Sequence, residues 1–212
     1  MPVTTTSRAA QARFQPIAFQ TIRPAGGLLP IDALRKIAAG DASASRPADY
    51  HLVGVRSVAD AAERHWDYLK GAWRALREQL GEAGSAPGPD PSGLAASDWL
   101  LPLLEEHGFG RVQPLPAGIT GDDGTTLPVS HAWNSVPVHL VPWDSDLDRR
   151  PASGGLPPQS LLQQALNRSA AHLWGIVSNG RQLRILRDSA ALSGISYVEI
   201  DLEAMFDVGD PR

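Results

Sequence analysis

Apolar side chains recur at helical spacing over residues 57–80, the longest periodic stretch of the chain. The apolar positions in this stretch lie three or four residues apart and are Trp66, Leu69, Trp73, Leu76 and Leu80. Such spacing places them on one face of a helix. Ser57 followed by Asp60 is typical of a helix N-cap. The pattern therefore predicts a helix over 57–80, preceded by a shorter one from about Ile31 to Ala39 that ends at Gly40.

The C-terminal half alternates between helical and strand-like patterns. A helix is expected to begin at the cap Ser97 and to stop at Gly108. Strands are expected near 111–115, 126–131 and 136–142, followed by a helix over 159–171 whose inward residues include Leu162 and Leu166. A hairpin and a strand over 196–202 complete the predicted order.

The hairpin has the sharpest local signal, because Asn179-Gly180 separates two apolar runs. This dipeptide favours a two-residue type I′ turn. A turn centred there predicts the pairs Ser178/Arg181, Ile176/Leu183 and Trp174/Ile185. Trp174 is then expected to be a core residue.

A Gly/Pro/Ser-rich stretch over 81–93, GEAGSAPGPDPSG, predicts a linker. It divides the expected organisation into a loosely ordered lead-in over 1–24, a helical arm over 25–80 and an α/β domain over 94–208. Composition agrees with a folded chain, with 42% hydrophobic and 20% charged residues among 212.

Cysteine is absent, which excludes disulfides, thiol catalysis and cysteine-ligated zinc. No apolar stretch is long enough to span a membrane and no signal core is visible, so a cytoplasmic location is expected. The net charge of -4 conceals an asymmetry: residues 1–80 carry eleven Lys/Arg against seven Asp/Glu, and 81–212 carry eight against sixteen. A polyanionic partner is thus expected to meet the N-terminal part.

The motifs of an adenine methyltransferase are missing from this chain. None of its three asparagines, Asn134, Asn167 and Asn179, precedes a proline, so the Asn-Pro-Pro-(Tyr/Phe) grip on a flipped base is absent. No glycine-rich cofactor loop is present either. The chain itself is therefore expected to have no cofactor-binding and no catalytic residues.

The predicted order of helix, three strands, helix and strand from 97 to 178 is that of the PD-(D/E)xK nuclease core. Such a core needs carboxylates for magnesium and a lysine for the attacking water. The third predicted strand, VPVHLVPWD, places His139 where an acidic ligand would be needed, and no lysine follows Lys70. The fold class expected is thus α/β (α+β): a helical arm followed by a degenerate nuclease-like mixed sheet flanked by helices.

Two other groups of residues contain side chains that can bind metals. Asp144, Asp146 and Asp148 alternate, but the glycine and glutamate of a calcium loop do not follow them. The histidines in this half, His107, His131, His139 and His172, show no metal-ligand spacing. A solvated turn with Asp-Arg pairing is the preferred interpretation, and no metal is expected.

Several long phrases of the chain resemble a known family. They include SDWLLPLLEEHGFGRV, LPVSHAWNSVPVHLV, DLDRR, SLLQQALNRSAAHLWGIVSNGRQLRILRDS and YVEIDLEAMF. Together they look like the N-terminal region of large bacterial type IIG-like adenine-N6 DNA methyltransferases, including that of the DISARM phage-defence system. The resemblance covers roughly 22–208.

The resemblance implies a non-catalytic N-terminal domain of a restriction or phage-defence methyltransferase that serves as a scaffold or regulatory module. S-adenosylmethionine would be the cofactor of the full-length protein, and this chain would be a fragment or a split-gene product. The implied partners are double-stranded DNA, bound weakly through the parent protein, a C-terminal methyltransferase domain, and other defence proteins. No membrane partner is expected.

Two alternatives stay open at this stage. One is a residual magnesium nuclease that uses residues around Asp144–Asp148, and the other is a protein-docking module. The candidate DNA contacts are Arg64, Lys70, Arg74, Arg149, Arg150 and Arg184. The candidate docking face consists of Trp66, Leu69, Trp73 and Leu76.

Overall fold

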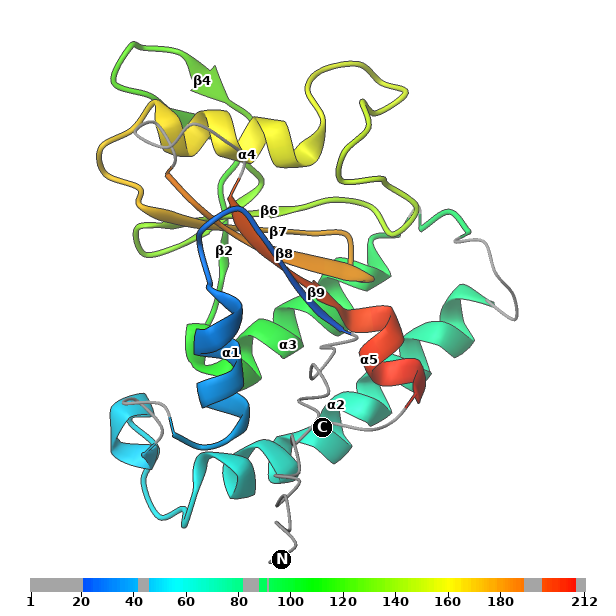
Figure 1. Ribbon diagram of the computed structural model, residues 1–212. Helices are drawn as coiled ribbons and strands as arrows, with labels where there is room; N and C mark the ends of the chain where they lie inside the picture. Colours follow the sequence, from blue (N-terminus) through cyan, green and yellow to red (C-terminus); the bar gives the residue numbers. More distant parts are fainter. Residues whose placement is uncertain (1–20, 42–45, 82–87, 91, 189–195, 209–212) are drawn as a thin grey trace, which may run out of the picture.

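The computed structural model describes residues 21–41, 46–81, 88–90, 92–188 and 196–208. It is a mixed α/β fold in which helices cover both faces of a seven-stranded, mostly antiparallel sheet. Helix α4 lies on one face, and α2, α3 and α5 lie on the other (Figure 1). No helix among the described residues is long and apolar enough to cross a membrane.

The strands of the large sheet follow the order β1-β9-β8-β7-β6-β5-β2. Their bounds are β1 Ile22–Ala25, β2 Gln113–Pro114, β5 His131–Trp133, β6 Val136–Leu140, β7 Trp174–Ser178, β8 Gln182–Arg187 and β9 Tyr197–Asp201. The pair β6/β7 is parallel and every other pair is antiparallel. The crossover between β6 and β7 contains α4 (Pro158–Asn167), as a parallel pair requires.

The helices of the N-terminal part are confirmed. The structure has α1 at Ile31–Ala38, a short 3₁₀ turn, η1, at Pro47–Tyr50 and α2 at Val58–Leu80. The Ser57 side chain accepts a hydrogen bond from the backbone N–H of Asp60 at 3.0 Å. Gly81 ends α2 in the left-handed conformation, with φ 68°.

The expected lead-in over 1–24 is wrong for its last residues. Ile22–Ala25 forms the edge strand β1, which pairs with β9 through Ile22↔Ile200 and Ala25↔Tyr197. The partner strand lies far away in the sequence, so nothing local in IRPA indicated this pairing. Residues 1–20 lie outside the described part of the chain.

The helix expected from Ser97 begins two residues earlier. Ala95–Phe109 forms one helical segment in three parts, η2 (Ala95–Leu100), α3 (Leu101–Leu104) and η3 (Glu105–Phe109). The cap is Asp90, whose carboxylate accepts from the backbone N–H groups of Leu94 and Ala95 at 2.8 and 2.9 Å. Because Asp90 lies within the expected linker 81–93, the sequence pattern hid its role.

The expected strand 126–131 is divided in the structure. Thr126–Leu127 (β4) pairs with Ile119–Thr120 (β3) in a small separate sheet, whereas His131–Trp133 (β5) joins the large one. Pro128 separates the two pieces and has no N–H to continue a ladder. The predicted helix 159–171 is found as α4, which ends at Asn167. The last helix, α5, spans Leu202–Val208.

The hairpin forms, but its register differs from the prediction by two residues. The observed pairs are Ser178↔Leu183, Ile176↔Ile185 and Trp174↔Arg187. The central turn residues are thus Gly180 and Arg181, and Gly180 has φ 90°. Because Arg181, the second central residue, is not among the residues with positive φ, the turn is of type II′ rather than type I′.

Asn179 explains the shift, because its side chain is used outside the turn centre. Its amide oxygen accepts from the backbone N–H groups of Arg181 and Gln182 at 3.0 and 2.8 Å, while its Nδ2 donates to the Ser145 carbonyl at 2.8 Å. A fully buried asparagine with these bonds is held at the first turn position.

The expectation that Trp174 is a core residue is wrong. The two-residue shift leaves Trp174 on the predicted face of the sheet. It changes the register partner of Trp174 from Ile185 to Arg187, at the end of the hairpin far from the turn. The side chain of Trp174 is 40% exposed, and the Arg187 guanidinium lies 5.6 Å from its ring centroid. The fully buried tryptophans of the core are instead Trp99 and Trp143, and the Trp143 ring lies 5.5 Å from that of Trp73, centroid to centroid.

Candidate functional site

The strands that would hold a nuclease centre carry no acid and no lysine. Strand β5 reads HAW and β6 reads VPVHL. His139 of β6 lies in register with Val177, which packs in the hydrophobic cluster beneath α4. His139 is buried and its Nδ1 has no hydrogen-bond partner among the described residues.

Burial, and secondarily the nearby His131, lower the pKa of His139 from 6.5 to about 4. The imidazole is therefore neutral at neutral pH. Burial lowers the pKa of His131 as well. A neutral imidazole without a carboxylate partner supplies neither the hard oxygen ligands nor the charge that a magnesium centre needs. This arrangement does not provide the chemistry of a metal-dependent nuclease.

Next to His139 and Val177, the same face of the sheet carries a clamp built around Arg184. Val177, Arg184, Glu199 and Arg23 follow one another across β7, β8, β9 and β1. The side chain of Arg184 is 5% exposed, and its Nε donates to Glu199 at 2.8 Å. Its two terminal nitrogens bind Asp148 in a bidentate pair at 2.7 and 2.8 Å.

Two further groups complete the Arg184 clamp. Gln159 of α4 accepts a hydrogen bond from the guanidinium, and the ring of Tyr197 lies 4.6 Å from Cζ. The clamp joins β8, β9, α4 and the loop after β6. Arg184 was expected to contact DNA, and this is wrong, because its donors are engaged within the protein and it has almost no exposed surface.

The acidic turn Asp144–Asp148 is bound by its own neighbours. Asp146 accepts from the backbone N–H of Asp148 at 2.8 Å and pairs with Arg149 at 3.4 Å. The hydrogen bonds from Arg184 hold the pKa of Asp148 below its ordinary value. Within the described ranges, no group of three or more His, Asp or Glu side chains is placed to hold a metal ion.

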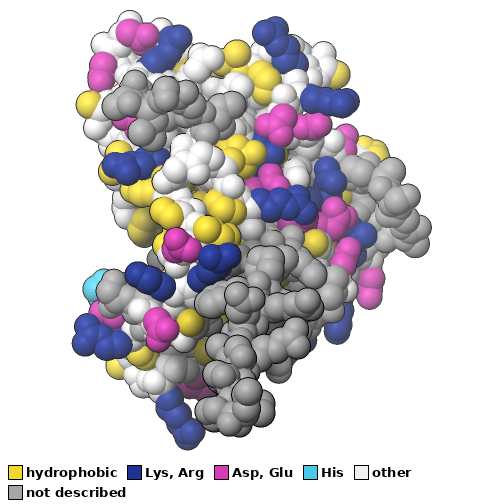
Figure 2. Space-filling view, in the orientation of Figure 1, with side chains coloured by type: hydrophobic (Ala, Val, Ile, Leu, Met, Phe, Trp, Pro, Cys, Tyr) yellow, Lys and Arg dark blue, Asp and Glu magenta, His cyan; other side chains and the backbone are white. Residues whose placement is uncertain are grey.

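The remaining candidate DNA contacts lie in two places. Arg64 and Arg74 are exposed on α2, and Lys70 on the same helix is half-buried and pairs with Asp67 at 3.1 Å. Arg149 and Arg150 are exposed in the loop after β6. On the face shown in Figure 2, the described Lys and Arg side chains alternate with Asp and Glu rather than forming one basic patch.

The candidate docking face of α2 contacts the rest of this chain. Leu69, Trp73 and Leu76 are buried against η2, the sheet and α5, and Trp66 is half-buried with its ring stacked on Phe206. Trp73 also donates through Nε1 to Asp207 at 2.9 Å. Helix α2 and the sheet thus share one hydrophobic cluster across the expected linker.

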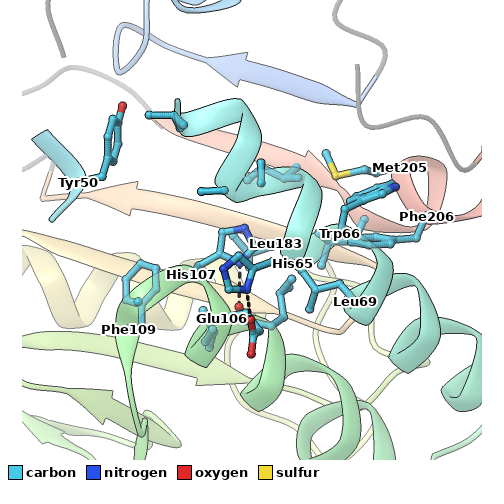
Figure 3. Close-up of a pocket in the computed structure, with 18 of the residues that line it drawn as sticks. Tyr50, His65, Trp66, Leu69, Glu106, His107, Phe109, Leu183, Met205 and Phe206 are labelled. Carbon is cyan, nitrogen blue, oxygen red and sulfur yellow. Dashed lines mark hydrogen bonds and ion pairs between the residues drawn. The ribbon is translucent and has the colours of Figure 1, made fainter. Parts of the chain in front are cut away.

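Beside this cluster the structure contains an apolar pocket of about 470 Å³ (Figure 3). Helix α2, η3, the sheet and α5 contribute its walls, which include Leu69, Phe109, Leu183, Met205 and Phe206. The Nδ1 of His65 on α2 and the carboxylate of Glu106 on η3 form a hydrogen bond at its wall, and His107 binds the Leu103 carbonyl through Nδ1 at 2.8 Å.

Sequence reasoning missed this pocket and the Arg184 clamp. The apolar positions of α2 indicated a buried face but not that its N-terminal turns enclose a space. The clamp had a usable signal, since Arg184 and Glu199 lie on strands predicted to be neighbours. Comparison with known proteins adds no relative: no family model, no curated protein and no solved structure matches the chain.

Proposed function

We propose that this chain is a non-catalytic module of a bacterial adenine-specific DNA methyltransferase of the restriction or phage-defence kind. In this proposal the module scaffolds or regulates a separate methyltransferase domain, which binds S-adenosylmethionine, and contacts DNA weakly. The identity of the partner enzyme comes from the resemblance of the phrases over 22–208 to that family.

The arrangement of the elements supports the nuclease-like part of the proposal. The segment Ala95–Phe109 is followed by β2, the small separate β3/β4 sheet, β5 and β6, then α4 and β7, which is parallel to β6; in the large sheet alone, three strands therefore precede α4. Helices α3 and α4 lie on opposite faces of these strands (Figure 1). This is the order of helix, three strands, helix and strand that such nuclease cores use.

His139 is the observation that carries the non-catalytic part. It occupies the third strand of this order as a buried, neutral side chain, and neither β5 nor β6 supplies a carboxylate or a lysine. The acids nearest in sequence, Asp146 and Asp148, are bound to Arg149 and Arg184. A sheet that keeps this arrangement of strands without catalytic groups suits the proposed scaffold role.

A cleavage and cofactor assay tests the absence of catalysis. Purified protein incubated with supercoiled plasmid and Mg²⁺ or Mn²⁺ should leave it intact, and calorimetry should detect no binding of S-adenosylmethionine. Micromolar binding of the cofactor would contradict the proposal. Nicking that disappears in an Asp146→Ala variant would establish the residual nuclease in its place.

A salt titration tests the DNA contact. Binding to a short duplex should weaken steeply with salt, and each lost phosphate contact should lower the slope of log K against log salt by about 0.9. The variant Arg64→Ala/Arg74→Ala should lower that slope by about 2. The control Arg46→Ala removes an exposed positive charge, paired with Asp49, from the same half of the chain and should leave the slope unchanged. Equal slopes for all three proteins would remove α2 from the DNA-contacting surface.

The scaffold role requires a methyltransferase domain that this chain binds. The methyltransferase partner in this proposal carries a glycine-rich cofactor loop and an Asn-Pro-Pro-Tyr segment. Expressed as a separate polypeptide, such a domain should copurify with this chain and lose adenine methylation activity when the chain is omitted. A domain that is fully active alone and does not bind this chain would refute the scaffold role.

A further inference from the structure

The apolar pocket beside α2 has the size and the walls of a small-molecule site. Its volume of about 470 Å³ lies within the roughly 300–1,000 Å³ that pockets for drug-sized ligands occupy. Most of the residues that line it are aliphatic or aromatic, as are Leu69, Leu183 and Phe206. Such walls favour a ligand with a hydrocarbon body, because its burial removes apolar surface from water.

Two histidines give this pocket a polar wall. His65 and His107 both line the pocket, and Figure 3 shows both rings close to Glu106. The Nδ1 of His65 is bonded to the Glu106 carboxylate, and the Nδ1 of His107 is bonded to the Leu103 carbonyl at 2.8 Å. Both partners are acceptors, so each ring carries a hydrogen on Nδ1. In the neutral imidazole the Nε2 atom is then an acceptor, and neither Nε2 has a partner among the described residues.

The charges at the walls favour a neutral ligand over an anion. Among the described residues that line the pocket there is no lysine and no arginine, whereas Glu106 contributes a carboxylate. A carboxylate or phosphate ligand would approach this acid without a fixed positive charge to bind it. A neutral hydroxyl group meets no such repulsion and can donate to a free Nε2 atom. Its oxygen can also accept, and the buried indole N–H of Trp66 in the same walls has no acceptor among the described residues.

We propose that this pocket binds a neutral, apolar small molecule that carries a hydroxyl group, an alcohol or a phenol. The hydrocarbon body lies between α2 and the sheet, and the hydroxyl group donates to the Nε2 of His65 or His107. Glu106 and the Leu103 carbonyl act as positioning groups, because they hold the Nδ1 atoms and leave the Nε2 atoms to the ligand. This site is additional to the proposed scaffold role and does not depend on it.

Three probes of similar size, 2-naphthol, 2-methylnaphthalene and 2-naphthoate, test the chemical class by equilibrium dialysis against the full chain. We expect 2-naphthol to bind with a Kd below about 1 mM. It should bind about threefold more tightly than 2-methylnaphthalene, which cannot donate a hydrogen bond, and 2-naphthoate should bind most weakly. A purely apolar pocket would prefer the more hydrophobic methyl compound. That order, tightest binding of 2-naphthoate, or no binding of 2-naphthol up to 1 mM would each overturn the proposal.

Variants locate the bound probe, with folding checked by circular dichroism. His65→Phe/His107→Phe keeps aromatic rings in both places but removes the acceptors, so the preference for 2-naphthol over 2-methylnaphthalene should disappear. The matched control His172→Phe changes an exposed histidine outside the pocket, whose Nδ1 is bonded to the Ser135 carbonyl, and should keep the preference. Ala61 is buried and lines the pocket, so Ala61→Phe should fill it and weaken the binding of 2-naphthol at least tenfold.

The two kinds of variant fail in different ways. A preference for 2-naphthol that survives in His65→Phe/His107→Phe would show that the histidines do not bind the hydroxyl group, and it would overturn the proposal. An affinity unchanged in folded Ala61→Phe would place the bound probe outside this pocket and would also overturn it. If Ala61→Phe does not fold, the comparison of the double histidine variant with His172→Phe still decides the outcome.

Discussion

Removing the guanidinium of Arg184 leaves two kinds of group behind, and their exposure sets the cost. The side chain of Glu199 is 7% exposed and would lose its 2.8 Å ion pair with Arg184. Its 3.4 Å pair with Arg23, whose side chain is largely exposed, would remain. Gln159 would lose a buried donor. Asp148 is 61% exposed at its side chain, so water can replace most of what it loses.

The cost of Arg184→Ala is therefore concentrated at Glu199. Breaking a buried ion pair by removing one partner typically costs about 3–5 kcal/mol, because the other charge remains desolvated. In a chain of this length one kcal/mol moves Tm by about 2–4 °C, so we expect Tm to fall by roughly 6–20 °C. Thermal unfolding followed by circular dichroism measures this directly.

Arg149→Ala is the matched control. Arg149 pairs with Asp146 in the same loop, but its side chain is 85% exposed, and exposed pairs contribute about 0–1 kcal/mol. Its Tm should stay within about 4 °C of that of the natural protein. Equal Tm shifts for Arg184→Ala and Arg149→Ala would refute the reasoning, since burial would then have no effect.

A double variant separates the buried charge from the lost packing. Glu199→Gln in the Arg184→Ala background removes the unpaired charge, so Arg184→Ala/Glu199→Gln should be more stable than the sum of the single changes predicts. Additive free energies of unfolding would show that the two side chains are not coupled and that the clamp does not exist in solution.

Three further changes test the tryptophans, the turn and the buried histidine. In urea denaturation, Trp143→Ala should lower the free energy of unfolding by about 3–5 kcal/mol and Trp174→Ala by less than about 1 kcal/mol; equal losses would contradict the observed register. Gly180→Ala should lower the free energy of unfolding by about 1–3 kcal/mol more than Gly155→Ala. Both glycines have positive φ, but a Cβ at position 180 would lie 2.9 Å from the Trp143 ring, whereas a Cβ at position 155 would contact nothing within 4 Å. The pKa of His139 is lowered from 6.5 to about 4, so the unfolded chain binds a proton at this site more readily than the folded one. As the pH decreases from 6.5 to about 4, the free energy of unfolding should therefore fall by up to about 1.4 kcal/mol per pH unit. A pH series of unfolding curves should lose this component in His139→Gln, and an unchanged slope would show that His139 protonates freely in the folded protein.

Helices were the part of the fold that the sequence predicted best, because their signals are local. The cap at Ser57, the stop at Gly81 and the spacing of Leu69, Trp73 and Leu76 all lie within α2 itself. The hairpin was found for the same reason. Its register was not, because it depends on Ser145, which is 34 residues away from Asn179 and accepts from its side chain.

The edge strand β1 and the apolar pocket were beyond sequence reasoning for a different reason. IRPA has no alternation that marks a strand, and it becomes one by pairing with residues 197–200. The pocket depends on how far α2 stands from η3 and the sheet. No spacing within one element encodes that distance.

His139 shows how much of a residue's place in the fold could be predicted from the sequence. Its place on the third strand, without a lysine, could be read from VPVHLVPWD and holds in the structure. Its burial and low pKa could not, because they depend on α4 covering that face of the sheet.

Arg184 was assigned to the DNA contacts because its charge was interpreted without its surroundings in the fold. In QLRILR, Leu183 and Ile185 face the cluster around α2, and this left Arg184 to be read as the exposed side of a hairpin. The crossover helix α4 covers that side, so both faces of β8 are buried, and a charged side chain there requires a partner of opposite sign. The partner was visible in YVEID on the next predicted strand, where Glu199 lies directly opposite Arg184. The same pairing bears on the proposed function. The Arg184 guanidinium lies 2.8 Å from the Glu199 carboxylate and neutralises its charge, so this carboxylate is not free to bind a cation. Glu199 lies on the face of the sheet that α4 covers and Asp148 lies in the loop beside it, and Arg184 engages both. Asp201, on the same face of β9, pairs with Arg23 at 3.2 Å. The charge of Arg184 is therefore better explained by these internal ion pairs than by contact with DNA.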